Sequence, residues 1–144
     1  MVCLGNICRS PLAEGILKSK VNSEKVFVDS AGTGGYHIGS KPDSRSIEIA
    51  HKYGVDITNQ RCRKFSPIDF QDFDIIYVMD NRNYQNIINI ANSEADVQKV
   101  KLLLDVLDHG PKEVPDPYYG QNDGFKNVFH MIDKACAKIA SSLN

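Results

Sequence analysis

The sequence predicts a single-domain α/β protein in which a mostly parallel, four-stranded sheet carries helices on both faces. Short apolar runs that are typical of buried strands alternate along the chain with segments of helical periodicity, and this alternation is typical of parallel sheets. The 144 residues, 42% of them hydrophobic and 24% charged, suit one domain over residues 1–144 with a sizeable core.

The first part of the chain is expected to form two helices, one strand and a glycine-rich loop. A helix begins at Ser10-Pro11, after which apolar residues recur with helical spacing at positions 12, 13, 16, 17 and 21. A strand is predicted at residues 26–28, and a loop with glycines at positions 34, 35 and 39 follows it. The second helix is predicted to start at Asp43 or Ser44, which are common capping residues, and to stop at Gly54.

The rest of the chain is expected to form two internal strands and a long final helix. Residues 73–79 and 100–104 are apolar enough to be buried strands. The last helix is the clearest periodic segment, because its apolar residues form one stripe. That stripe comprises Phe125, Val128, Phe129, Ile132, Ala135, Cys136, Ile139 and Leu143. Cys136 is therefore expected in the core.

Composition and charge argue against several classes of protein. The formal net charge of −1 argues against bulk nucleic-acid binding, and the basic stretch at residues 61–64 is expected to be a solvated face. No apolar run approaches membrane-spanning length and no apolar leader precedes Cys3, so we expect a cytoplasmic protein without a membrane contact. The four cysteines are too few for a secreted disulfide scaffold, and neither they nor the four histidines have metal-ligand spacing.

The most informative segment is the loop from Cys3 to Arg9, directly before the first helix. Backbone N–H groups of such a loop can form a cup for an oxyanion, with the Arg9 guanidinium at its rim and the helix N-terminus facing inward. Both features favour the thiolate form of a cysteine, so Cys3 is predicted to be a nucleophile in an N-terminal phosphate-binding loop. Gly5 and Asn6 tolerate the backbone conformations that the loop needs, and Ser10 can donate to the thiolate.

A second informative segment lies at residues 114–120. Phosphoryl transfer from an ester to a thiolate expels an alkoxide or a phenoxide, so the leaving oxygen needs a proton donor. Asp116 stands between two prolines that restrict the backbone, so its carboxyl is stiffly presented. Asp-Pro is also ordinary turn chemistry. The combination with the Cys3 loop makes Asp116 the predicted general acid.

Residues 2–11 resemble, almost residue for residue, the signature of the low-molecular-weight protein tyrosine phosphatases, and the resemblance continues to the final helix. It implies a hydrolase that cleaves phosphotyrosine in proteins or peptides, binds inorganic phosphate or other oxyanions, and needs no cofactor or metal. The resemblance places the acid at Asp116 and makes Tyr118 and Tyr119 walls for an aromatic substrate. The other loop residues expected at the substrate are Leu4, Gly5, Asn6, Ile7, Cys8 and Ser10.

The expected reaction has two steps. Cys3 attacks phosphorus while Arg9 and the loop N–H groups hold the oxygens and Asp116 protonates the leaving phenol. Asp116 then activates the water that hydrolyses the phosphocysteine, while Ser10 steadies the departing thiolate.

The resemblance also implies supporting residues. Ser30 matches a serine that braces the loop asparagine, Tyr36 aligns with an aromatic wall of the cleft, and Asp80 lies in a segment near that cleft. Gln60 stands where the family often has histidine. Cys8 is expected either to trap an oxidised Cys3 as a disulfide, as family members with both cysteines can, or to pack beneath the loop as a small apolar residue.

The resemblance further implies a full first strand before the loop. Only Met1 and Val2 precede Cys3, so we expect that this chain lacks the start of that strand. The sequence does not indicate an oligomeric state.

Four alternatives share parts of this pattern. Arsenate reduction on the same fold needs two further cysteines on a mobile segment, whereas Cys62 and Cys136 are far apart in the sequence. Protein-arginine phosphatases have threonine where this chain has Ile7. A cysteine phosphocarrier would hold phosphate without hydrolysing it, which leaves Asp116 without a role. The last alternative is a catalytically silent phosphate-binding module.

Overall fold

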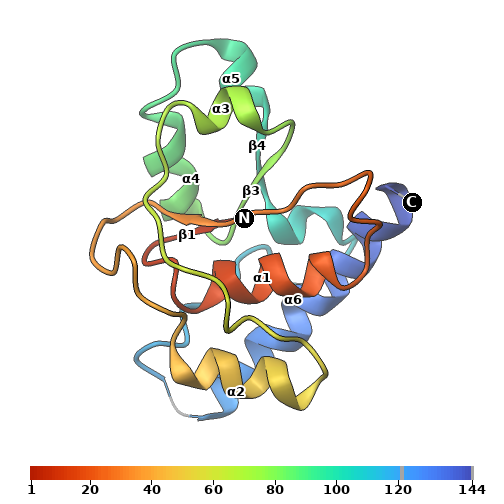
Figure 1. Ribbon diagram of the computed structural model, residues 1–144. Helices are drawn as coiled ribbons and strands as arrows, with labels where there is room; N and C mark the ends of the chain where they lie inside the picture. Colours follow the sequence, from red (N-terminus) through yellow and green to blue (C-terminus); the bar gives the residue numbers. More distant parts are fainter. Residues whose placement is uncertain (121, 144) are drawn as a thin grey trace.

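Four short parallel strands form the centre of the molecule (Figure 1). They are β1 (Val2–Cys3), β2 (Ala31–Gly32), β3 (Ile76–Val78) and β4 (Val100–Leu102), in the order β2-β1-β3-β4. Val2 pairs with Ala31 on one side and with Val78 on the other, so β1 is a central strand. The structure is a computed structural model that describes residues 1–120 and 122–143, with the backbone alone at position 122.

Helices cover the sheet in two layers. Figure 1 shows α1, α2 and α6 below the strands, α3 and α5 at the top, and α4 to the left of β3 and β4. The elements of the first layer are α1 (Arg9–Lys18), α2 (Ser44–Lys52) and α6 (Asn122–Leu143). Those of the second are α3 (Asp69–Asp72), α4 (Asn81–Ile88) and α5 (Glu94–Gln98), and a short 3-10 helix η1 (Leu103–Val106) follows β4. The predicted fold class, a parallel sheet with helices on both faces, is confirmed.

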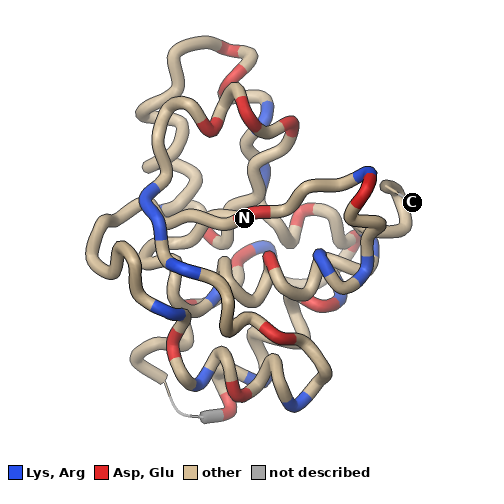
Figure 2. The backbone as a smooth tube through the Cα atoms, in the orientation of Figure 1, with Lys and Arg blue, Asp and Glu red and all other residues tan. Residues whose placement is uncertain are grey.

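Each layer has its own apolar core. The larger core joins α1 and α6 below the sheet, where Leu12 and Ile132 are fully buried. The smaller core lies on the opposite face around Phe70 and Ile87. Cys136 is fully buried in the larger core, as its place in the apolar stripe predicts. Figure 2 marks both basic and acidic positions along the backbone of each layer.

The helix boundaries follow local capping chemistry. The Asp43 carboxylate accepts a hydrogen bond from Arg45 N and thereby caps α2, and Gly54 just beyond that helix has φ 81°. Both features match the predicted second helix. The first helix ends at Lys18, so Val21 packs against the core from the loop that follows rather than from the helix.

The strand predicted at residues 26–28 is wrong, because β2 forms five residues later than the prediction begins it. A strand needs a hydrogen-bonded neighbour, and the bonds to this edge of the sheet begin at Asp29, whose backbone oxygen accepts from Met1 N, with Val2 in register with Ala31. Val28 is nevertheless buried, whereas Phe27 is 76% exposed and stacks on Phe73. The expectation that the chain lacks the start of its first strand stays a prediction.

The other strands are shorter than predicted, and the structure adds short helices. β3 occupies three residues in the second half of residues 73–79, and β4 occupies the first three of residues 100–104, after which the chain turns directly into η1. The helices α3, α4 and α5 were not predicted, since each buries two side chains or fewer and therefore leaves little periodic signal. Among the described residues, no helix combines the length and the hydropathy needed to cross a bilayer.

Candidate active site

The loop between β1 and α1 folds around the sulfur of Cys3. Asn6 N donates to Cys3 Sγ over 3.3 Å, and Ser10 Oγ lies 3.1 Å from the same sulfur. Asn6 has φ 55°, the left-handed conformation that lets the chain close into a cup. The parallel sheet places this cup at the carboxyl end of its central strand, where open α/β sheets bind their ligands.

A chain of hydrogen bonds runs from a buried carboxylate to the Cys3 sulfur. Glu14 Oε1 accepts from Ser30 Oγ at 2.7 Å, so the Ser30 oxygen is left to accept from Asn6 Nδ2 at 3.0 Å. Asn6 Nδ2 also donates to Ser10 Oγ at 2.8 Å. Because the Ser10 oxygen accepts from that amide, its own proton can be donated to Cys3 Sγ at 3.1 Å or to Ala31 O at 3.5 Å, and the sulfur is the nearer acceptor. The structure thus places Ser30 against Asn6, as the resemblance implies.

The remaining polar atoms of Asn6 are held from the other side. Its carboxamide Oδ1 accepts from Arg63 N at 2.9 Å, and its backbone oxygen accepts from the Cys62 thiol at 2.7 Å. Asn6 is 2% exposed, so these partners replace water for every polar group of the residue. The left-handed turn is therefore fixed by its surroundings rather than by Asn6 alone.

The Arg9 guanidinium is buried and oriented by three oxygens. Arg9 Nη1 donates to Asp80 Oδ2 at 2.6 Å and to the backbone oxygen of Val114 at 2.9 Å, while Nη2 lies 3.7 Å from Asp116 Oδ2. Arg9 is 2% exposed, so its charge is desolvated beside two carboxylates. The contact brings the segment after β3 and the predicted acid to the rim of the loop.

One cavity of about 340 Å³ joins the residues that the sequence singled out. Its lining includes Cys3, Leu4, Gly5, Ile7, Cys8, Arg9, Tyr36, Asp116, Tyr118 and Tyr119. The other three predicted residues, Asn6, Ser10 and Ser30, are buried beneath the loop rather than in its lining. His37 also lines the cavity, although the sequence analysis did not single it out.

The segment that carries Asp116 is tied to the start of α2. Asp116 Oδ1 accepts from Tyr118 N at 3.0 Å, and Arg45 Nη1 donates to Tyr118 O at 3.2 Å. The Arg45 guanidinium also lies over the ring of Phe125 at 4.6 Å and is paired with both carboxylate oxygens of Asp43. This pairing holds the pKa of the Asp43 carboxyl below its ordinary value. Arg45 therefore restrains the backbone next to the predicted acid.

The other three cysteines are protonated at neutral pH. Burial raises the pKa of Cys8 to about 12, that of Cys62 to about 11 and that of Cys136 to about 12. All four cysteines are buried free thiols. Cys8 lies in the cavity lining beside the loop, and its two predicted roles, as a disulfide trap or as a packing residue, both stay open.

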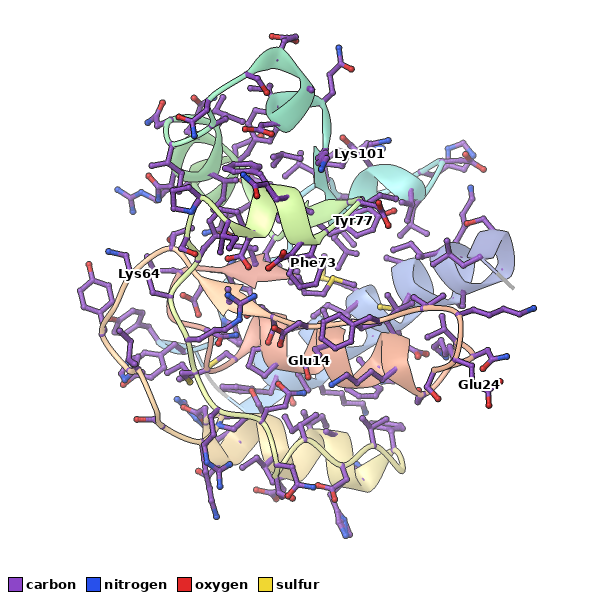
Figure 3. All side chains as sticks on the ribbon, turned by 45° about the horizontal axis from the view of Figure 1, so that its top comes forward. Glu14, Glu24, Lys64, Phe73, Tyr77 and Lys101 are labelled. Atoms are coloured by element: carbon purple, nitrogen blue, oxygen red, sulfur yellow. The ribbon has the colours of Figure 1, made fainter. Side chains whose placement is uncertain are left out.

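Sequence reasoning missed Glu14, Arg45 and Cys62, and it identified Asp80 only as lying near the cleft. A signal for Glu14 is present in the sequence, because this carboxylate stands four residues after Ser10, on the buried side of α1 (Figure 3). Gln60 donates from Nε2 to Pro11 O at 3.0 Å, so it contacts the first turn of α1. Within residues 1–120 and 122–143, no group of three or more His, Cys, Asp or Glu side chains is arranged to hold a metal ion.

Comparisons with known proteins agree on one family. A family model described as low molecular weight phosphotyrosine protein phosphatase matches residues 1–144. The low molecular weight phosphotyrosine protein phosphatase of Schizosaccharomyces pombe is 42% identical over 137 residues, covering 91% of this chain and 86% of the relative. A protein tyrosine phosphatase from Entamoeba histolytica, solved with Hepes in the active site, has a TM-score of 0.92 at 38% identity and covers 99% of this chain and 93% of its own. The tyrosine phosphatase Wzb from Escherichia coli K30, solved with sulphate, has a TM-score of 0.88 at 31% identity, with coverages of 99% and 95%.

We expect Gly32→Ala to weaken binding of inorganic phosphate by about tenfold or more. A Cβ on Gly32 would lie 2.8 Å from the backbone oxygen of Leu4 and 3.1 Å from Asn6 N, so the cup itself would have to shift. Isothermal titration of phosphate into both proteins measures the effect. Gly35→Ala is the control, because its nearest neighbour would be a side-chain atom at 3.5 Å. Equal affinities for Gly32→Ala and Gly35→Ala would show that the cup does not depend on this close contact.

Proposed function

The chain belongs to the low molecular weight phosphotyrosine protein phosphatase family, and on that premise we propose that Cys3, Arg9 and Asp116 carry out its reaction. The enzyme is a protein-tyrosine phosphatase, a hydrolase of aryl phosphate monoesters. The observation that supports the residue assignment is the single cavity at which a buried thiol, a fixed guanidinium and a carboxyl meet. Its substrates are phosphotyrosine residues of proteins or peptides.

In the bound substrate, the phosphoryl group occupies the cup formed by the loop. Backbone N–H groups and Arg9 surround its equatorial oxygens, and α1 directs its N-terminus at the same point. Bound sulphate in the Escherichia coli relative and Hepes in the active site of the Entamoeba relative support an oxyanion at this place. The exposed rings of Tyr36 and Tyr119 flank the mouth of the cavity and can pack against a phenyl ring.

In the first step, the Cys3 thiolate attacks phosphorus, and an S–P bond forms as the P–O bond to the phenol breaks. The negative charge that develops on the phenolic oxygen is neutralised by a proton from Asp116. Arg9 supports both parts of the step, since it is held by Asp80 and by Val114 O in the orientation that faces the cup.

In the second step, Asp116 takes a proton from a water molecule whose oxygen attacks phosphorus, and the S–P bond breaks to release phosphate and thiolate. The departing sulfur is stabilised by Asn6 N and by the proton of Ser10. The chain from Glu14 through Ser30 and Asn6 keeps that proton directed at the sulfur.

A thiolate nucleophile favours a reducing compartment. Oxidation would remove the attacking sulfur, and cytosolic thiol systems keep cysteines reduced. We therefore assign the enzyme to the cytoplasm.

The alternatives on this fold are less well supported. In the arsenate-reducing scheme, Cys136 would have to leave the core of α6, where it is fully buried and donates to Ala13 O. For the phosphocarrier and for a silent binding module, the position of Asp116 over the cup would have no purpose. A protein-arginine phosphatase is disfavoured by Ile7 in the cavity lining.

We expect Cys3→Ser to bind inorganic phosphate and to lose turnover of p-nitrophenyl phosphate by at least about 1000-fold, because a neutral hydroxyl replaces the attacking thiolate. Steady-state kinetics and phosphate titration measure the two properties separately. Cys62→Ser is the matched control, since it changes a thiol outside the cavity lining and keeps a donor for the backbone oxygen of Asn6. Activity near that of the wild type in Cys3→Ser would contradict the assignment of the nucleophile.

Asp116→Asn should slow hydrolysis of a phosphotyrosine peptide by about 100-fold or more and that of an aryl phosphate with a good leaving group far less. The reason is that an acidic phenol leaves without a proton, whereas tyrosine does not. The comparison of kcat for the two substrates measures the difference. An equal loss of kcat on both substrates would show that another carboxylate is the acid. Asp80, which lies 2.6 Å from Arg9, would be the next candidate.

A further inference from the structure

We propose that three basic residues on the surface that adjoins the cavity wall, Lys41, Arg61 and Lys64, select phosphotyrosine substrates with acidic residues near the phosphotyrosine. This inference rests on the proposed function and names the class of peptide that the site prefers. We call these three residues the basic strip.

The strip is built from two chain segments that carry no carboxylate. Residues 30–42 and 57–68 contain no Asp or Glu. The two segments run side by side, because Gly39 N donates to Cys62 O and Cys62 N donates to Ser40 O, each at 2.8 Å, and Phe65 N donates to Gly32 O at 2.8 Å. Figure 2 shows the consequence as a run of blue segments down the left edge of the molecule with no red between them. The strip is therefore a local positive surface on a protein whose formal net charge is −1.

The charges of the strip are exposed and not neutralised. Lys41, Arg61 and Lys64 are all exposed, and none has a carboxylate partner within ion-pair distance in the described part of the chain. Arg61 donates only to backbone oxygens, at Thr58 and Gln60. The neighbouring Arg63 differs, because Asp29 and Asp69 pair with it and it is only half-exposed. Arg63 is for that reason not part of the strip.

The strip begins beside the wall of the active-site cavity and runs away from it, since Arg61 lines a separate cavity together with Asp29 and Asp56. Tyr36 and His37 line the cavity and belong to the first of the two segments. The stem of Lys64 passes beside Gly35, since a Cβ on that glycine would lie 3.6 Å from Lys64 Cδ. Tyr36 and Ile38, 75% and 65% exposed, add apolar surface to the same segment. A peptide whose phosphotyrosine enters the cavity must cross this wall or the opposite one.

The wall that carries Asp116 has no surplus positive charge. Asp116 lies there with Tyr118 and Tyr119, and the Arg45 guanidinium that holds Tyr118 O is paired with both carboxylate oxygens of Asp43. Acidic residues of a substrate would therefore be attracted by the strip rather than by this wall. Three exposed cations on a protein without net positive charge fit a short acidic peptide better than a nucleic-acid backbone, which needs more contacts for useful affinity.

Three phosphotyrosine peptides of equal length test the proposal: one has three glutamates before the phosphotyrosine, one has three after it, and one has glutamines at all six positions. At low ionic strength we expect kcat/KM for the better acidic peptide to exceed that for the neutral one by about tenfold. The ratio should fall towards one in 1 M salt, where charges are screened within about 3 Å. The triple variant Lys41→Gln/Arg61→Gln/Lys64→Gln should lose the ratio and keep wild-type turnover of p-nitrophenyl phosphate, which has no flanking residues.

A matched control removes three exposed lysines elsewhere, with Lys25→Gln/Lys101→Gln/Lys134→Gln. Figure 3 shows Lys101 on the side of the molecule away from Lys64. This variant should keep the preference for the acidic peptide.

Two results would overturn the proposal: equal kcat/KM for acidic and neutral peptides in the wild type, or an unchanged ratio of the two in the strip variant. In either case, turnover of p-nitrophenyl phosphate would still uphold the phosphatase activity. No turnover of any substrate would instead reject the proposed function. Sedimentation with vesicles that contain 30% phosphatidylserine tests a membrane as the alternative partner. If the vesicles captured the wild type but not the strip variant, and the wild type showed no peptide preference, the strip would be reassigned to a membrane surface.

Discussion

The site depends on one asparagine in a left-handed backbone conformation. Asn6 turns the chain so that the residues after Cys3 wrap around the position above its sulfur. A left-handed non-glycine residue costs on the order of 1–3 kcal/mol, whereas each hydrogen bond of its buried network contributes roughly 1 kcal/mol. Asn6 makes five such contacts, from its backbone N and O and from its carboxamide, so the network outweighs the cost. The cup is thereby formed before any anion arrives, and a bound phosphoryl group need not organise it.

The parallel sheet brings the remaining groups to that cup. β1, β2 and β3 all end at the same edge, and each is followed by a segment that reaches the site: the Cys3 loop, the Tyr36 segment and Asp80 respectively. The acid segment arrives from a fourth direction and is fixed twice, because Val114 N donates to Met79 O and Arg45 holds Tyr118 O. The proposed nucleophile, the guanidinium and the proposed acid thus depend on different parts of the chain, which explains how residues far apart in the sequence lie close together in space.

Local chemistry was readable from the sequence where it depends on contiguous residues. The Cys3 loop, the cap of α2 at Asp43 and the apolar stripe of α6 each occupy one segment, and the resemblance of residues 2–11 to a known family supplied the rest of the reaction. The strand expected at residues 26–28 failed because pairing depends on where β1 begins, which no property of residues 26–28 reveals. Contacts such as Arg9 with Asp80, or Cys62 with Asn6, join residues more than fifty positions apart and leave no periodic pattern. The roles of Cys3, Arg9 and Asp116 remain predictions that the geometry supports.

The covalent intermediate is the most direct measure of this account. The enzyme is mixed with excess phosphotyrosine peptide, quenched in denaturant within milliseconds and digested, and the peptide that begins the chain is fragmented in the mass spectrometer. The account predicts one phosphate per protein molecule on the sulfur of Cys3 and none on Cys8, whose pKa of about 12 keeps it protonated. Phosphate on any other side chain, or rapid turnover with no phosphorylated protein in the quench, would contradict it.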